Sequence, residues 1–437
     1  MPKKIVQNWG NYPKIEAEIT SVSNLHELKE AIKSKSKLIA RGNGRCYGDS
    51  ALQKNIVSTL KLNKLLFFDK KNGLLKAESG ILLADILDII VPHGFFLPVT
   101  PGTKWISLGG AVASNIHGKN HHKEGGIANY IVSFELINES GESIFCSRTE
   151  NTALFSETIG GMGLTGIISS ITLQLKTIET SFIQQKSIKA KNLEELLDLF
   201  EQHHHFTYSV AWIDCLKKGK NLGRSILMLG EHATKNELSS NQKIALKLHP
   251  NKTINIPFYF PNFSLNRYSI QLFNALYYNK QWDKEKNSLV HYDSFFYPLD
   301  KINNWNKIYG NNGFTQYQLV IPFERGREGL KEIIHTISQS GIGSFLAVLK
   351  TFGKKDEFAS SLSFPMEGYT LALDFKISPE VFSLLDQLDK IVSAYNGKLY
   401  LTKDARMPKA MFEKCYPNFK AFTHKFISLQ TERLCQL

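Results

Sequence analysis

The sequence predicts an α+β protein of two domains. Its 437 residues are more than one hydrophobic core usually serves, since domains average about 150 residues. Short apolar runs bounded by glycine and polar turns alternate with segments of helical periodicity, which predicts mixed strands and helices. We expect residues 1–180 to form one domain and residues 181–397 a second, α+β domain. Residues 398–437 are expected to return to the first domain.

Four strands and one helix are expected early in the first domain. The strands are predicted at residues 37–40, 57–62, 65–69 and 74–78, which are short apolar runs. Residues 71–73 predict a hairpin turn between the last two strands. Residues 81–91 carry apolar side chains at helical spacing, and Pro92 ends that helix. Residues 164–175 predict a strand pair.

Composition changes near residue 180. Glycine becomes rarer and aromatic residues become dense, above all between Phe258 and Tyr297. Strands expected at residues 316–322, 345–350 and 369–375 alternate with amphipathic helices. We interpret this region as a wall against a bound molecule. The aromatic run is expected to be core or a loop cover, with the lining of an apolar entrance as the alternative.

The chain carries a formal net charge of +13. Its lysines are dispersed, and no zinc-finger pattern, RNA-binding motif or basic helix is present, so nucleic-acid binding is not expected. A loose association with an anionic membrane surface is favoured instead. The N-terminus lacks the apolar core of a signal peptide, and no apolar run is long enough to span a bilayer. We expect a cytoplasmic protein, peripheral at the inner membrane.

Cysteines and histidines do not predict a metal site. The five cysteines are Cys46, Cys146, Cys215, Cys415 and Cys435, which are scattered and odd in number, as expected of reduced thiols. Histidines occur in runs at residues 121–122 and 203–205. Contiguous histidines cannot all face one ion from a helix or strand, so no metal is expected.

Three glycine-rich segments carry the chemistry: residues 41–49 (RGNGRCYGD), 101–122 and 160–167. Glycines this close let backbone N–H groups turn inward and cradle a phosphate. In the second segment, small residues from Gly109 to Ser114 allow close approach at a helix start, where free N–H groups favour a diphosphate. Neither a GxGxxG fingerprint nor a P-loop is present. Taken singly, each segment is as compatible with a structural turn as with a binding loop.

Taken in order, the motifs resemble those of the vanillyl-alcohol-oxidase-like flavoproteins. They are RGNGRCYGD, PGT, SLGGAVASNIHGKNHH, GMGLTGI, AWID, WNKIYG, FTQYQLVIP, FLAVLKTFG, SFP, LDF and LYLTKDAR. Within that family they are similar to the branch whose members oxidise decaprenylphosphoryl-β-D-ribose. The resemblance implies a two-domain fold with a PCMH-type FAD-binding domain and an α+β substrate domain. Its motifs extend from residue 41 to residue 406.

The resemblance implies which residues contact FAD. They are Arg41, Gly42, Asn43, Gly44, Arg45, Cys46, Tyr47, Pro101, Gly102, Thr103, Ser107, Gly110, Ser114, Ile116, His117, Gly118, Gly166, Ile167 and Tyr400. Many relatives attach FAD covalently through a histidine in the first glycine loop. That position is Arg45 here, so the resemblance implies noncovalent FAD, and Cys46 is expected to be a packed small residue rather than a flavin link.

The resemblance also implies substrate contacts at Lys119, Trp212, Gln316, Gln318, Lys350 and Ala372. Alcohol oxidation needs a base for the hydroxyl proton while hydride leaves the carbon, and His117 and Lys403 are the candidates. Lys119 and Lys350 are equally suited to bind a phosphate. The simpler alternatives are a satisfied core histidine at His117 and a solvated lysine at Lys403. Mycobacterial members carry a cysteine where this chain has Ala372, which predicts insensitivity to inhibitors that capture that cysteine.

The implied substrate is a polyprenyl-phosphoryl pentose, oxidised at its 2-hydroxyl group to a 2-keto sugar. A separate NAD(P)H-dependent keto-reductase would complete an epimerisation to the arabinose form for cell-envelope or glycoconjugate synthesis. Reoxidation by quinone or by oxygen stays open. The aromatic run would then be able to line an entrance for the polyprenyl tail.

Two alternatives compete with this interpretation. The first is an FAD-dependent aldonolactone or alditol oxidase acting on a soluble sugar. Such relatives carry an HWxK-type stretch near the C-terminus, whereas this chain has Thr423-His424-Lys425 without a tryptophan. The second is a flavin-free scaffold that binds a lipid carrier or a partner reductase, which would require decayed flavin segments. The segments are intact.

Overall fold

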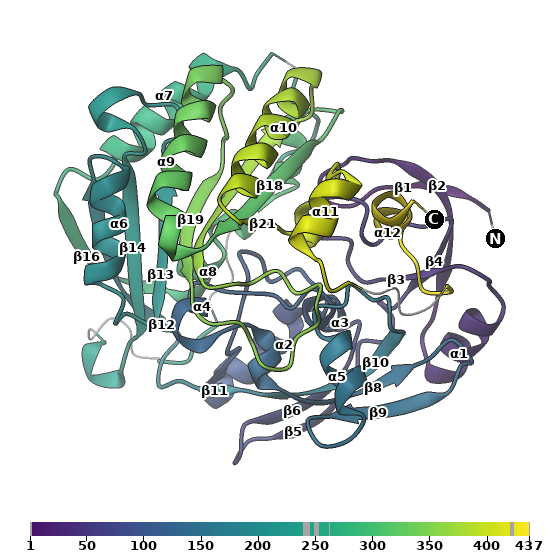
Figure 1. The fold of residues 1–437 in the computed structure, drawn as a ribbon. Helices are drawn as coiled ribbons and strands as arrows, with labels where there is room; N and C mark the ends of the chain where they lie inside the picture. Colours follow the sequence, from purple (N-terminus) through teal and green to yellow (C-terminus); the bar gives the residue numbers. More distant parts are fainter. Residues whose placement is uncertain (1, 239–244, 249–252, 262, 420–423, 437) are drawn as a thin grey trace.

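The computed structural model describes residues 2–238, 245–248, 253–261, 263–419 and 424–436, and it contains three larger sheets with flanking helices (Figure 1). Thr423 of the C-terminal stretch lies outside these residues. The predicted α+β class is confirmed. Across the part of the chain that the structure describes, none of the helices has both the length and the apolar character needed to cross a bilayer.

Two sheets belong to the N-terminal part of the chain. The first has the order β1-β2-β4-β3, formed by β1 (Lys4–Val6), β2 (Ile15–Ser21), β4 (Asn55–Ser58) and β3 (Ile39–Arg41). The second has the order β5-β6-β10-β8-β9, formed by β5 (Leu65–Asp69), β6 (Leu74–Glu78), β10 (Ile167–Gln174), β8 (Ile131–Ile137) and β9 (Ser143–Ser147). The predicted β5–β6 hairpin is confirmed, and Gly73 in its turn has a φ of 67°.

The predicted strand pair at residues 164–175 is wrong. This segment is a single strand, β10, which pairs antiparallel with β6 on one side and β8 on the other. A continuous apolar run fits a strand buried in the middle of a sheet as well as it fits two short strands, so composition alone does not separate them.

The predicted helix at residues 81–91 is α2 (Leu83–Ile90), whose buried residues include Leu83, Leu87 and Ile90. Helix α3 (Leu108–Ala113) packs against β10. The other elements are α1 (Leu25–Lys33), α4 (His121–Glu124), α5 (Thr152–Thr158), α7 (Arg267–Asn279), α8 (Tyr292–Phe296) and the pairs β7 (Phe95–Phe96) with β11 (Lys176–Thr177) and β15 (Ile254–Asn255) with β17 (Ile302–Asn303).

The third sheet has eight strands in the order β16-β12-β14-β13-β19-β20-β18-β21. They are β12 (Phe182–Ala190), β13 (Tyr208–Ile213), β14 (Ser225–His232), β16 (Glu285–His291), β18 (Phe314–Ile321), β19 (Ala347–Phe352), β20 (Gly368–Lys376) and β21 (Lys398–Leu399). The helices α6 (Leu193–Gln202), α9 (Phe323–Ser340) and α10 (Pro379–Ala394) cover one face (Figure 1). The three predicted strands of this region correspond to β18, β19 and β20.

Strand periodicity divides the side chains of this sheet between two environments. Leu319, Leu349 and Leu371 belong to one hydrophobic cluster with the helices. Their neighbours Gln318 and Ala372, which are paired in the register of β18 and β20, point to the opposite face because successive side chains alternate. The face opposite the helices is therefore available to form a site.

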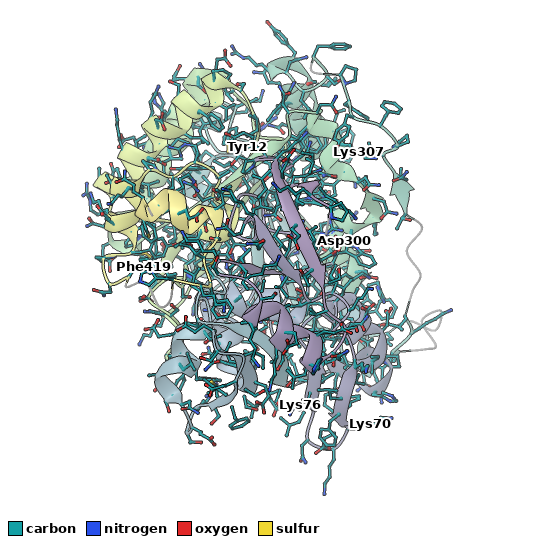
Figure 2. The ribbon with its side chains drawn as sticks, turned by 90° about the vertical axis from the view of Figure 1, so that its right-hand side faces the viewer. Tyr12, Lys70, Lys76, Asp300, Lys307 and Phe419 are labelled. Atoms are coloured by element: carbon teal, nitrogen blue, oxygen red, sulfur yellow. The ribbon has the colours of Figure 1, made fainter. Side chains whose placement is uncertain are left out.

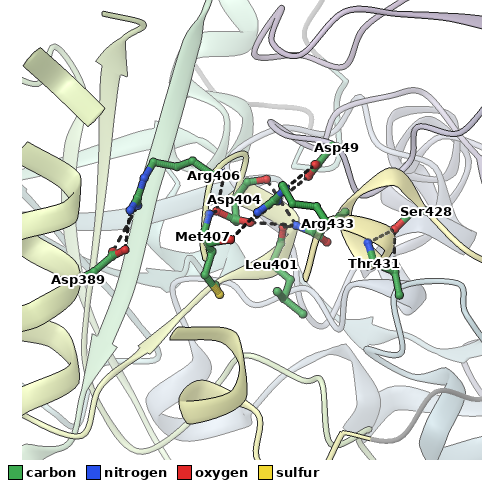
Figure 3. Close-up of polar contacts among 10 residues, drawn as sticks. Asp49, Asp389, Leu401, Asp404, Arg406, Met407, Ser428, Thr431 and Arg433 are labelled. Atoms are coloured by element: carbon green, nitrogen blue, oxygen red, sulfur yellow. Dashed lines mark hydrogen bonds and ion pairs between the residues drawn. The ribbon is translucent and has the colours of Figure 1, made fainter. Parts of the chain in front are cut away.

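The C-terminal segment connects the large sheet to the first glycine loop. After β21 the chain forms α11 (Lys409–Cys415) and α12 (Leu429–Cys435). Arg433 in α12 donates to both carboxylate oxygens of Asp49, at 2.9 and 3.0 Å, and to Asp404 at 2.8 Å (Figure 3). These bonds fix the loop that carries Asp49 relative to the segment that follows Lys403. The domain boundaries at residues 180 and 397 stay a prediction.

Candidate active site

A cavity of about 400 Å³ is lined both by the glycine-rich segments and by the large sheet. It brings together all predicted site residues but one. Those that line it are Gly42, Asn43, Gly44, Arg45, Cys46, Tyr47, Pro101, Gly102, Thr103, Ser107, Gly110, Ser114, Ile116, His117, Gly118, Lys119, Gly166, Ile167, Trp212, Gln316, Gln318, Lys350, Ala372, Tyr400 and Lys403.

Arg41 is the exception, because its side chain points away from the cavity lining. Its guanidinium group donates to the Gln7 carbonyl at 2.8 Å and to Asn8 Oδ1 at 3.2 Å. It also lies against Gly44, where an added Cβ would collide with it and where φ is +61°. Arg41 therefore supports the glycine loop from behind, and its contact with FAD stays a prediction.

The first glycine loop has the donors that an anion requires. Within the described chain, the backbone N–H groups of residues 43–46 donate to no protein acceptor. The Asn43 side chain donates to the Trp105 carbonyl at 2.7 Å, which fixes the loop. Buried N–H groups that lack partners are costly, and successive ones form a nest for anionic oxygens. The loop therefore fits a phosphate group.

The second glycine segment differs from its prediction. The N–H groups of Leu108 and Gly109 bond the carbonyls of Ile81 and Ser79, and Gly110 N–H faces Ser107 Oγ at 3.4 Å. The start of α3 thus has fewer free donors than expected of a diphosphate site. This segment instead allows other groups to approach its backbone closely. A Cβ at Gly110 would lie 3.0 Å from Ser107 Oγ, and a Cβ at Gly42 would collide with Ser107.

The large sheet supplies a polar wall. Gln316 of β18 is paired with Asp374 of β20, and its amide nitrogen donates to Asp374 Oδ1 at 2.5 Å. Asp374 is fully buried, and burial raises the pKa of its carboxyl group. Asp374 is not among the site residues expected from the sequence. Asp374 follows Ala372 by two residues on the predicted strand, so both side chains point to the same face of the sheet. This spacing could have identified Asp374 from the sequence.

His117 is held by this wall. The amide nitrogen of Gln318 lies 3.0 Å from His117 Nε2 and 3.3 Å from Thr370 Oγ1. The Thr370 hydroxyl donates its proton to the Leu319 carbonyl, so Thr370 can only accept from Gln318. The Gln318 amide therefore donates to His117 Nε2. Burial and the neighbouring Lys350 hold the pKa of His117 well below its ordinary value, so the ring is neutral, with its proton on Nδ1.

Three lysine ammonium groups lie in the cavity. Burial lowers the pKa of Lys119 to about 7, and burial together with Lys403 lowers the pKa of Lys350 to about 7. Burial also lowers the pKa of Lys403, while the Asp374 carboxylate acts in the opposite direction. Lys119 donates to the Phe295 carbonyl, and Lys403 Nζ lies 3.9 Å from the centre of the Tyr47 ring. Concentrated positive charge of this kind favours an anionic ligand.

The aromatic run between residues 258 and 297 serves two purposes. Phe295, Phe296 and Tyr297 are buried, as core residues should be. Tyr277 lines the cavity, and its ring centre lies 4.7 Å from that of Trp212. The prediction of a cover or an apolar lining therefore holds for part of the run, and its other part is exposed.

The contiguous histidines have ordinary partners. His121 Nδ1 accepts the Gly353 N–H at 3.3 Å, and His122 Nε2 lies 2.9 Å from the Phe206 carbonyl. Among the described residues, no three histidine, cysteine or carboxylate side chains form a group able to hold a metal ion.

Comparison with known proteins identifies the family of this chain. Residues 13–147 match the family model described as an FAD binding domain. The decaprenylphosphoryl-beta-D-ribose oxidase of Mycolicibacterium smegmatis is 33% identical over 425 residues, which cover 95% of this chain and 92% of that protein. The chain belongs to the decaprenylphosphoryl-β-D-ribose oxidase family. As a member of this family with an FAD-binding domain, it is an FAD-dependent oxidoreductase.

More distant matches bear on the alternatives. An uncharacterized protein of Streptomyces coelicolor is 28% identical over 77% of this chain and 92% of its own length. The L-gulonolactone oxidase of Scyliorhinus torazame is also 28% identical, but over only 45% of each chain. The lactone-oxidase alternative thus rests on partial matches. The phosphate nest and the close glycine contacts fit the FAD of the decaprenylphosphoryl-β-D-ribose oxidase family.

Proposed function

We infer that this enzyme oxidises the 2-hydroxyl group of a polyprenyl-phosphoryl pentose to a ketone. The observation that carries the proposal is the group of half-buried lysines beside the glycine loops. FAD has its own candidate phosphate nest in residues 43–46, so Lys119 and Lys350 are left for a second anion. A phosphorylated sugar supplies that anion, whereas a neutral lactone or alditol does not.

The chemistry is divided among named residues. Lys403, whose pKa burial lowers, takes the proton of the substrate hydroxyl group. His117 is neutral and its Nε2 already accepts a bond from Gln318, so it orients the bound groups rather than serving as the base. When bound, FAD accepts the hydride that leaves the carbinol carbon. The substrate thereby loses one proton and one hydride and becomes the keto sugar.

Residues of the first loop support a noncovalent cofactor. Arg45 occupies the position of the covalent histidine of other flavoproteins, and its guanidinium carbon lies 3.9 Å from the centre of the Trp9 ring. Burial raises the pKa of the Cys46 thiol, which disfavours the thiolate needed for a flavin link. Residues 42–47, 101–103, 107, 110, 114, 116–118, 166–167 and 400 are proposed to contact FAD.

Two further steps complete the proposal. A 2-keto sugar can be converted to the epimeric alcohol only by hydride delivery to the other face. We propose that a separate NAD(P)H-dependent keto-reductase supplies that hydride and yields the arabinose form. We also propose that the enzyme works as a cytoplasmic protein at the inner membrane surface, where it would meet a lipid-linked substrate. The division into domains at residues 180 and 397 belongs to the same proposal.

The test is anaerobic bleaching of the flavin absorbance of purified holoenzyme. A short-chain polyprenyl-phosphoryl ribose is compared with soluble lactones and alditols at equal concentration. Rapid bleaching by the phosphorylated ribose alone supports the proposal. Bleaching by soluble sugars alone would assign the enzyme to the lactone or alditol oxidases.

A further inference from the structure

Helix α7 has an exposed apolar face. Tyr268, Leu272 and Leu276 are 79%, 62% and 65% exposed. They are spaced four residues apart, so they form one stripe along the helix. Of the fifteen large hydrophobic side chains exposed in the described chain, eight lie between Ile254 and Trp282. Apolar surface concentrated in this way marks an interaction site, whereas scattered single residues do not.

The opposite face of α7 belongs to the active site. Tyr277 lines the cavity beside Trp212, and the ring centres of Phe273 and Phe345 are 4.5 Å apart. A helix of this length spans about 20 Å. One side of α7 therefore contacts the substrate wall, and the exposed apolar residues lie on the other side. The helix itself lies at the edge of the molecule (Figure 1).

Two further exposed aromatic side chains flank the helix. Phe263 precedes α7 and is 78% exposed, and its carbonyl accepts a hydrogen bond from the N-cap residue Asn266. Trp282 follows the helix and is 92% exposed. We call Phe263, Tyr268, Leu272, Leu276 and Trp282 the α7 stripe. Tyrosine and tryptophan at the edges of an apolar surface are typical of the boundary between lipid and water.

The charges around the α7 stripe are suited to an anionic surface. Helix α7 has Arg267 at its start and no acidic residue, and Lys280 caps its end. Lys307 lies near the exposed Tyr259 ring, 5.9 Å from its centre. Basic residues beside an amphipathic helix add electrostatic attraction to the burial of its apolar face.

We propose that the α7 stripe rests on the surface of a bilayer containing anionic phospholipids and so holds the cavity next to the membrane. The inference rests on the proposed function, because a polyprenyl-linked substrate resides in lipid and gives the enzyme a reason to bind a membrane. It names the surface that delivers this substrate: the apolar tail passes along α7 while the sugar phosphate reaches Lys119 and Lys350. Membrane binding itself is measured without turnover.

The experiment uses full-length holoenzyme and vesicles of phosphatidylcholine, with or without 30% phosphatidylglycerol. Flotation measures binding, and quenching of Trp282 by brominated lipid reports insertion, with Trp282→Phe assigning the signal. Leu272→Glu/Leu276→Glu is the test variant. Phe67→Glu is the matched control, because Phe67 is also an exposed apolar residue, with an exposed fraction of 57%. Phe67 pairs with Lys76 in the β5–β6 hairpin. Figure 2 shows Lys76 at the opposite end of the molecule from Lys307.

The wild type and the Phe67→Glu variant are expected to bind the anionic vesicles equally. The double variant should bind at least tenfold more weakly, with its melting temperature unchanged. Absence of binding by the wild type, or equal binding by the double variant, would overturn the inference. A change from dimer to monomer in light scattering with vesicle binding intact would assign the stripe to a second copy of the chain, and so also overturns it.

A separate arm keeps this inference distinct from the proposed function. The short-chain, water-soluble phosphoribose substrate should bleach the flavin of the double variant as fast as that of the wild type. If the flavin of neither protein is bleached while vesicle binding follows the expected pattern, the proposed substrate is wrong. The assignment of the α7 stripe as a membrane-binding surface is then still supported.

Discussion

The side-chain amide of Gln318 donates to Nε2 of His117 across 3.0 Å, and this contact determines the role of the histidine. An imidazole nitrogen that accepts a hydrogen bond leaves the ring proton on the other nitrogen. Among the described residues, His117 Nδ1 has no hydrogen-bond partner. His117 is thus a neutral ring with one nitrogen occupied, which supports the proposal that Lys403 takes the proton.

The His117 tautomer can be observed directly by ¹⁵N NMR of histidine-labelled protein. The His117 signals should be those of the neutral Nδ1–H form and should not change between pH 5.5 and 8.5, because burial keeps the pKa of the ring well below its ordinary value. Gln318→Glu should bring the ring into titration within this range, since a carboxylate stabilises the imidazolium. His117→Asn assigns the signal. A protonated ring in the wild type would contradict the assignment.

Turnover should depend on neutral Lys403. Lys403→Met is expected to lower kcat by about 10²–10⁴-fold, the usual contribution of a general base, while FAD stays bound. In the wild type kcat should increase with pH, because the base must be deprotonated, and should level off below the ordinary lysine pKa of about 10.4. Exposed Lys390→Met is the control. If the Lys403→Met variant keeps the turnover of the wild type, Lys403 is not the base.

Lys350 should affect substrate binding more than turnover. A charge-assisted hydrogen bond contributes about 1.5–3 kcal/mol, so Lys350→Met should raise KM for the phosphoribose by about 10- to 100-fold. The lysine must be charged to hold phosphate and its pKa is lowered to about 7, so KM should also rise as the pH increases above 7. Steady-state kinetics between pH 6 and 9 measure both effects. An unchanged KM would place the phosphate elsewhere.

Gly110 tests the cofactor loops. Gly110→Val adds side-chain atoms beside Ser107 and at the cavity surface, with only the flexible Ser107 Oγ within 4 Å of the new Cβ. The protein should therefore fold but be isolated with little FAD. Flavin absorbance per protein gives the cofactor content, and the melting temperature of the protein stripped of flavin serves as the control. A full flavin content would mean that the cofactor does not approach the α3 backbone.

Arg433 should be required for stability. Its guanidinium group bonds Asp49 and Asp404, which are 2% and 8% exposed (Figure 3). Arg433→Met leaves both carboxylates without this charge partner, which costs about 3–5 kcal/mol when a buried pair is broken. Urea unfolding measures the free-energy change. Lys37→Met, which removes the exposed partner of Glu432 on the same helix, is the control and should change stability by under about 1 kcal/mol.

The sequence by itself determined the local elements and the chemical residue types. The hairpin of β5 and β6, helix α2 and the three strands of the large sheet follow from periodicities of two and 3.6, which depend on near neighbours alone. The glycine-rich segments, in order, identified the flavin family. The strands and helices could be predicted because each is encoded within about ten consecutive residues, and the family because the order of its motifs along the chain needs no knowledge of the fold.

Only the tertiary structure decided which of these residues touch. The antiparallel register of β18 and β20 places Asp374 beside Gln316, and the same wall brings Gln318 to His117, some 200 positions away in the chain. The Arg41 guanidinium group donates to the Gln7 carbonyl, 34 positions earlier in the chain. The exposure of the α7 stripe depends on which helix face the sheet covers. Each outcome is set by packing between segments distant in sequence, which no local pattern records.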